Sequence, residues 1–110
     1  MERSILIVNA TQVIISENNP HGLFSVVNGF PKVFDSGVTL DLEQNMRNAK
    51  AAYHAQLSAN YSNTNPNRVM MTVTLEASDG TMMLHEKIGE LPNIVPNVEP
   101  EETPEVEPEG

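Results

Sequence analysis

Apolar residues occur in short β-branched runs over most of residues 1–90, and one stretch alone has the spacing of a helix. Residues 4–16 are rich in isoleucine and valine and are apolar on both alternating sets of positions. Such a run predicts a strand buried on both sides, or two short strands that meet near Asn9–Gln12. Strand is favoured over helix because the run is short and β-branched.

Residues 23–34 have the pattern of a β-hairpin. Asn28-Gly29 lies at the centre, and this pair suits a two-residue turn because both central residues need positive φ. Counting outward from the turn places Phe24 opposite Val33. Pro31 has no backbone N–H, so the second arm is expected at an edge of the sheet.

Residues 68–88 form a second and better specified hairpin, with Asp79-Gly80 as the turn between two alternating runs. Setting Ser78 opposite Thr81 fixes the register, which a slip of one residue would disrupt by mixing the two faces. The expected pairs are Ala77 with Met82, Glu76 with Met83, Leu75 with Leu84, Thr74 with His85, Val73 with Glu86, Thr72 with Lys87 and Met71 with Ile88.

Residues 41–59 have helical periodicity. Apolar residues fall on one face at spacings of four, three, four and four: Leu42, Met46, Ala49, Tyr53 and Leu57. Thr39 or Asp41 can cap the start, and Asp41 with Gln44 resembles a capping box. The chain therefore predicts an α+β fold, in which an antiparallel sheet of a long N-terminal strand and two hairpins packs against one amphipathic helix.

The composition changes after residue 90, which predicts a compact domain over 1–90 and an extended tail over 91–110. Proline recurs at every fourth position of the tail from Pro92 to Pro108, and this spacing disfavours both helix and interior strand. The tail carries six of the fifteen acidic residues and no base, whereas 1–90 carry nine acids and six bases. Two interpretations stay open: a solubilising disordered end, or an extended arm that docks on a basic surface.

Charge and composition also exclude several classes of function. The six Lys and Arg residues are scattered and the net charge is -9, so a nucleic-acid partner is not expected. The absence of cysteine excludes disulfides, thiolate metal sites and a cysteine nucleophile. No apolar run approaches the roughly 20 residues of a membrane span, and no secretory signal is apparent. We expect a cytoplasmic protein, or one within a particle assembled in the cytoplasm.

The candidate chemistry is sparse. His21, His54 and His85 are expected in a loop, on the helix and on a strand, without the spacing of metal ligands. Paired carboxylates such as Glu76 with Glu86 have no sign of the buried pocket that acid–base catalysis requires. No phosphate-binding loop or nucleophile motif is present. The sequence therefore predicts neither a metal, nor a cofactor, nor an enzyme.

The leading hypothesis is a non-enzymatic interaction protein, a small accessory subunit of a larger assembly such as a virion, with other protein subunits or further copies of itself as partners. Met70 and Met83 fall on the hairpin face away from the core, where apolar side chains need cover. The expected partner-binding residues of the tail are Pro96, Pro100, Glu101, Glu102, Pro104, Glu105 and Glu107.

Two alternatives belong to other classes of function. One is a small enzyme or ligand-binding domain with a pocket between sheet and helix, lined by Tyr53, His54 and His85. The other is a regulator whose acidic tail mimics the charge of a nucleic acid.

Overall fold

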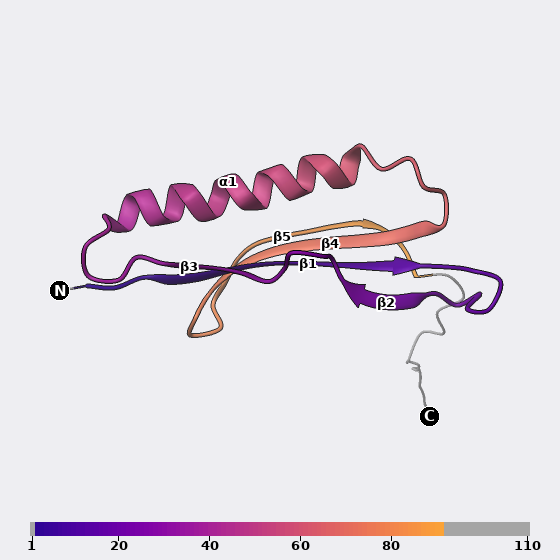
Figure 1. Cartoon of the computed structure of the whole chain (residues 1–110), viewed down its shortest axis with the longest axis horizontal. Coiled ribbons are helices and arrows are strands. Elements are labelled where there is room, and N and C mark those ends of the chain that lie inside the picture. Colours follow the sequence, from indigo (N-terminus) through magenta and orange to yellow (C-terminus); the bar gives the residue numbers. More distant parts are fainter. Residues whose placement is uncertain (1, 92–110) are drawn as a thin grey trace, which may run out of the picture.

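The β-branched runs form strands and the periodic segment forms a helix, in the order that the sequence predicts. The computed structural model describes residues 2–91, and these comprise β1 (Ile5–Ile14), β2 (Leu23–Val26), β3 (Lys32–Asp35), α1 (Leu42–Tyr61), β4 (Arg68–Ala77) and β5 (Met82–Gly89). The strands make one antiparallel sheet and α1 lies along one face of it (Figure 1). The predicted α+β architecture is therefore confirmed.

The sheet is organised around β1, which has partners on both sides. Its order is β2-β1-β4-β5, and β3 pairs with the same edge of β1 as β2 does. β2 pairs with the second half of β1, from Thr11 to Ile14, and β3 pairs with the first half, from Ile5 to Val8. Two short strands thus share one long edge, and both run antiparallel to β1.

The predicted hairpin at Asn28-Gly29 is wrong, because its two arms pair with β1 instead of with each other. A turn does form there, since the N–H of Phe30 donates to the carbonyl oxygen of Val27 at 3.1 Å. The chain then continues along β1 in the same direction as before. A separate hairpin would leave this edge of β1 without partners, whereas the observed path satisfies the backbone groups of both halves. The prediction that the segment after Pro31 lies at a sheet edge is confirmed.

The second predicted hairpin is confirmed over most of its length. The pairs from Leu75–Leu84 to Met71–Ile88 have the expected register. The turn end differs, since Glu76 pairs with Met82 and Met83 becomes the extra residue of a bulge. Gly80 has φ +94° and the N–H of Ala77 donates to the carbonyl oxygen of Thr81, so the turn has three residues instead of two. This longer turn moves Met82 out of the predicted core, and it is exposed.

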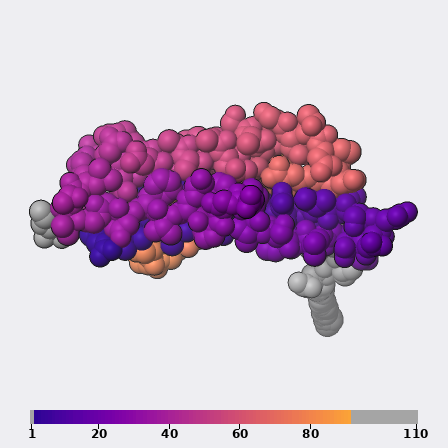
Figure 2. All heavy atoms as spheres, in the orientation of Figure 1, coloured from indigo at the N-terminus to yellow at the C-terminus, as the bar shows by residue number. Residues whose placement is uncertain are grey.

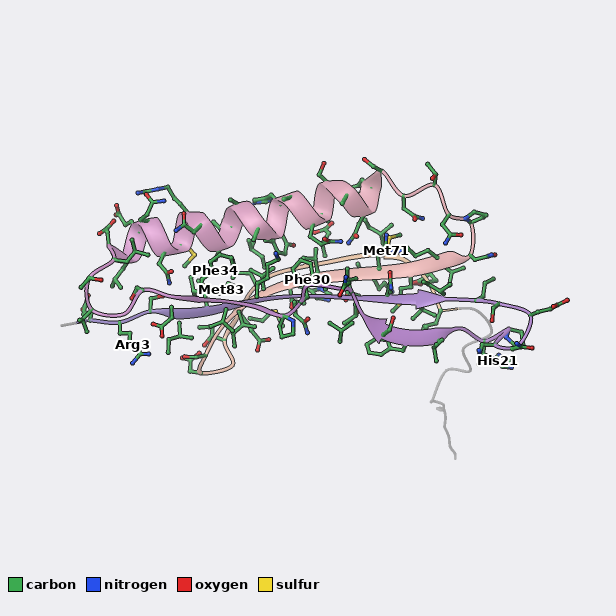
Figure 3. All side chains as sticks on the ribbon, viewed as in Figure 1. Arg3, His21, Phe30, Phe34, Met71 and Met83 are labelled. Atoms are coloured by element: carbon green, nitrogen blue, oxygen red, sulfur yellow. The ribbon has the colours of Figure 1, made fainter. Side chains whose placement is uncertain are left out.

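The core lies between α1 and the sheet. Asp41 caps the helix as predicted, because its side chain accepts from the backbone N–H of Gln44. The buried cluster draws on both layers and consists of Leu6, Val8, Ala49, Tyr53, Val73 and Leu75. Phe30, Phe34 and Met71 lie in the same layer, beneath the helix (Figure 3). Burial of these side chains provides the main driving force for packing α1 on the sheet.

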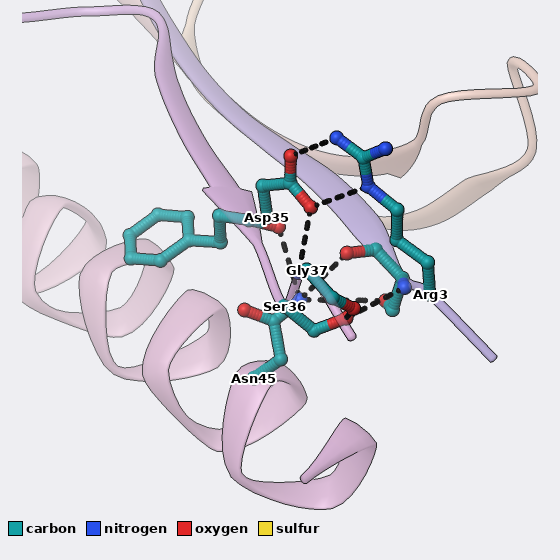
Figure 4. Close-up of polar contacts among 7 residues, drawn as sticks. Arg3, Asp35, Ser36, Gly37 and Asn45 are labelled. Atoms are coloured by element: carbon teal, nitrogen blue, oxygen red, sulfur yellow. Dashed lines mark hydrogen bonds and ion pairs between the residues drawn. The ribbon is translucent and has the colours of Figure 1, made fainter. Parts of the chain in front are cut away.

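A buried amide fixes the first turn of α1 to the strands. The Nδ2 atom of Asn45 donates to the carbonyl oxygen of Phe34 at 2.9 Å and to that of Ser4 at 3.2 Å. The hydroxyl of the buried Ser36 accepts from the backbone N–H of Ser4 at 2.9 Å (Figure 4). The Ser36 hydroxyl thus satisfies the backbone N–H of Ser4, and the Asn45 amide adds a donor to a carbonyl group beside β1 and to one in β3.

Beside this network, an exposed ion pair joins the segment before β1 to the end of β3. The Nε and Nη2 atoms of Arg3 donate to the two carboxylate oxygens of Asp35 at 2.9 and 2.5 Å (Figure 4). The side-chain bonds from Arg3 and the backbone N–H of Gly37, with a lesser contribution from the charge of Arg3, lower the pKa of Asp35 from 3.8 to about 2, and desolvation opposes them.

We expect the Asp35 carboxyl to titrate near pH 2 and an Arg3→Gln variant to raise its pKa toward 3.8. Because the pKa is lowered in the folded protein, the stabilising contribution is complete above about pH 4 and is lost as the pH falls toward 2. Carboxyl NMR titration of both proteins measures the shift. Asp79 is the internal control, because bonds from Thr81 lower its pKa and Arg3 has no part in them. An unchanged Asp35 titration in the variant would contradict the assignment to Arg3.

Candidate interaction surface

The sheet has a second face, away from α1, which we call the open face. Strand alternation and register place on it Ile5, Ile7, Asn9, Thr11, Val13, Phe24, Val26, Val33, Met70, Thr72, Thr74, Glu76, Met82, His85 and Lys87. Within residues 2–91, no helix or strand is layered over this face (Figure 1). Over these residues the sheet is therefore covered by a helix on one side only, and on the open face the side chains are at least partly exposed except for that of Val13, which is buried.

Large apolar side chains of the open face are exposed along its β2–β3 edge. Phe24 is 61% exposed, Val33 61% and Val26 46%. Exposed apolar residues that occur singly are ordinary, but several on one flat sheet face are typical of a surface that binds another protein. This edge is the most apolar accessible part of the face.

Residues that lie side by side across the strands divide the open face into an apolar end, a polar middle and a second end where Glu76 and Asp35 lie beside apolar side chains. At one end, which we call the Phe24 end, a row runs from Phe24 through Val13 and Met70 to Gly89. At the other, the Val33 end, a row runs through Ile7 and Glu76 to Met82.

The middle rows are polar. The hydroxyl groups of Thr11 and Thr72 share a hydrogen bond, and Lys87 lies beside Thr72. Asn9, Thr74 and His85 make up the next row. The apolar Phe24 end is thus separated from the Val33 end by polar side chains.

Met70 and Met83, which the sequence predicts as partner contacts, lie far apart along the β4–β5 hairpin. Met70 is half-buried on the open face at the Phe24 end, between Val13 and Gly89. Met83 lies in the bulge near the turn and is 41% exposed. The structure therefore does not bring them together in one patch. The predicted contacts of the tail lie outside the described residues: Pro96, Pro100, Glu101, Glu102, Pro104, Glu105 and Glu107.

Sequence reasoning missed Phe24, Val26 and Val33 as surface residues. Their segment is apolar on both alternating sets, so the pattern does not say which set faces the helix. Phe34 is half-buried against the core while its neighbour Val33 is exposed. The pairing of β3 with β1, which decides the face, joins residues far apart in the chain and leaves no local signal.

The residues proposed for a pocket between sheet and helix do not converge. Tyr53 is 3% exposed in the core, and burial, with contributions from the charges of Glu86 and Tyr61, raises the pKa of its phenol. His54 is exposed and its ring meets the Tyr53 ring edge-on at 5.2 Å. His85 is exposed on the other side of the sheet, across from Thr74.

The side chains of α1 and the sheet meet without a hollow on the side that Figure 2 shows. No pocket is found in the part of the chain that the structure describes, and residues 2–91 contain no group of three or more His, Asp or Glu side chains placed to hold a metal. No helix of this part is long and apolar enough to cross a membrane.

No protein-family model, curated protein or solved structure matches this chain. Its function is therefore inferred from its own surfaces and charges. The open face is the feature of residues 2–91 with the physical character of a binding site, because it combines accessible apolar side chains with a rigid sheet.

Proposed function

We propose that the protein is a non-enzymatic interaction protein, a small accessory subunit that joins a larger protein assembly through the open face of its sheet. The exposure of Phe24, Val26 and Val33 on a face without a covering layer is the observation that carries this proposal. Burying such side chains against a partner is favourable in proportion to the apolar area removed from water.

The charge distribution supports an additional contact by the tail. Residues 2–90 carry nine acids and six bases, and two of the bases, Arg3 and Lys87, are paired with Asp35 and Glu90. Because the domain itself has three more acids than bases, its net charge does not attract the six glutamates after residue 98. A partner with a basic surface complements them. A repeating particle such as a virion, assembled in the cytoplasm, is the kind of assembly that fits a small subunit with one apolar face and one acidic arm.

A Val33→Asp variant is expected to lose the stoichiometric partner that the unchanged protein captures from its native source. The substitution places a charge on the exposed apolar edge of the open face, which the bound state would have to desolvate. Val38→Asp is the matched control, because Val38 is 56% exposed in the segment between β3 and α1 and does not belong to the open face. Quantitative mass spectrometry of the captured proteins measures both.

Both variants should keep the stability of the unchanged protein within about 0.5 kcal/mol, since the changes are on the surface. Equal capture by the two variants would contradict the role of the open face. A truncation after Val98 tests the acidic arm separately, and we expect it to weaken capture most at low salt, where charge attraction is least screened.

A further inference from the structure

The Phe24 end of the open face lies next to the point where the chain leaves the sheet. A row of four residues crosses the sheet here, one from each of β5, β4, β1 and β2. In that order they are Gly89, the last residue of β5, then Met70, Val13 and Phe24. This row crosses three gaps between adjacent strands, or about 14 Å at the usual spacing. Phe24, at its far end, is the most exposed side chain of the row.

Two contacts hold the departing chain at the open face. The backbone N–H of Glu90 donates to the carbonyl oxygen of Val69 at 3.2 Å. The carboxylate of Glu90 pairs with the ammonium of Lys87 at 2.5 Å, and Lys87 belongs to the open face beside Thr72. The chain therefore starts its path beyond β5 at the near end of the Phe24 row.

The next seven residues, 92–98, have the composition and length to cross this row. They contain Ile94, Val95 and Val98 and carry no charge, and their two prolines bring no N–H groups to an apolar surface. Seven residues in an extended conformation reach about 22 Å, which exceeds the width of the row. Beyond Val98 the composition turns acidic, and Lys87, a cation of the open face near this end, is already paired with Glu90.

We infer that residues 92–98 dock across the Phe24 end of the open face of the same molecule and cover Phe24, Val26 and Met70. The acidic residues 99–110 then leave the domain from the β2 edge, on the side opposite to β5. The Val33 end stays accessible, so the partner of the proposed function contacts Val33 there and reaches Phe24 and Val26 only by displacing residues 92–98. This inference is separate from the proposed function, because it concerns contacts within one chain and holds or fails without any partner.

A single spin label tests the inference in the full-length protein. The chain has no cysteine, so an Asn97→Cys variant takes a nitroxide at one position only. In the 15N-labelled protein we expect loss of the amide signals of Phe24 and Val26 by paramagnetic broadening. The signals of Val33 and Glu76, at the other end of the face, should keep their intensity. Unbroadened Phe24 and Val26 signals would overturn the inference.

Two further samples decide which molecule provides the segment and what holds it. Spin-labelled 14N protein mixed with unlabelled 15N protein should leave the Phe24 signal intact, and broadening in this mixture would assign the face to a second copy instead. The double substitution Ile94→Asp with Val95→Asp should abolish the broadening in the single-chain sample, since it removes the apolar contacts. Broadening that persists in this variant would contradict apolar docking. The Val33→Asp capture experiment is unaffected by either result, so the two proposals fail separately.

Discussion

Replacing Asn45 by aspartate is expected to lower the free energy of unfolding by about 3 kcal/mol at neutral pH, because a carboxylate would face two carbonyl oxygens in a buried site. Asn45 is 2% exposed, and its amide is the donor to the carbonyl groups of Phe34 and Ser4. The substitution keeps the shape of the side chain but removes these donors. It also brings a negative charge next to both carbonyl oxygens, of which that of Ser4 has a further donor, the backbone N–H of Ser36.

Urea denaturation of Asn45→Asp and of a matched Asn48→Asp variant measures this effect. Asn48 lies one turn further along the exposed side of α1, where a carboxylate remains hydrated. We expect the control to change the free energy of unfolding by about 0.5 kcal/mol or less. Burial beside carbonyl oxygens raises the pKa of the new carboxyl in the folded state, so the loss should shrink as the pH falls from neutral toward about 4, where the protonated carboxyl regains a hydrogen-bond donor. Equal losses in the two variants would contradict the assigned role.

Replacing Gly89 by alanine is expected to destabilise the protein by about 3 kcal/mol, through backbone strain of about 1–2 kcal/mol and a steric clash. Gly89 has φ +85°, and a Cβ atom there would overlap the carbonyl oxygen of Val69 on the adjacent strand. Val69 cannot move freely, because its carbonyl accepts from Glu90 while the flanking Met70 pairs with Val13 in the centre of the sheet. The end of the β4–β5 pairing must therefore open to accept the methyl group.

Gly80 offers the control for this substitution within the same hairpin. Its φ is +94°, close to that of Gly89, but nothing lies within 4 Å of the position that a Cβ atom would take. Gly80→Ala should therefore show the strain alone, about 1 kcal/mol. The difference between the two variants in chemical denaturation isolates the clash. Faster hydrogen exchange of the Glu90 amide in the Gly89 variant would place the clash at the end of the β4–β5 pairing. Similar losses of stability in the two variants would contradict a clash at Gly89.

The elements that the sequence predicts correctly are those whose structure depends on local interactions. The register of β4 and β5 follows from alternation on either side of one turn, and the helix follows from its own apolar spacing and the cap at Asp41. The predicted two-residue turn between β4 and β5 is wrong, because Asp79-Gly80 is compatible with both two-residue and three-residue connections. With the three-residue turn, Met82 lies opposite Glu76 instead of Ala77, on the open face, where it is exposed.

The candidate site depends on contacts between distant parts of the chain, and these leave weaker signals. The pairing of β3 with β1 places Val33 opposite Ile7, and no residue near either position in the sequence predicts this pairing. The role of Asn45 could not be predicted either. A polar residue on the inner side of an amphipathic helix can be assigned a function only once its carbonyl partners are known. Apolar residues on both alternating sets show that strands are present but not which set is covered.

The broken edge of the sheet has a consequence for how the domain behaves at high concentration. The strand pairing along the β2–β3 edge of β1 is interrupted between β2 and β3. Val27 bonds to Ala10 and Lys32 pairs with Val8, so the four residues 28–31 lie opposite Asn9 alone. An incoming strand finds two four-residue segments with a protruding turn between them, which is a poor template for cross-β growth. β5 is eight residues long and regular beyond the bulge at Met83, and its adjacent Glu86 and Lys87 act as charged gatekeepers along that side. Protection against aggregation is thus geometric at one margin of the sheet and electrostatic at the other.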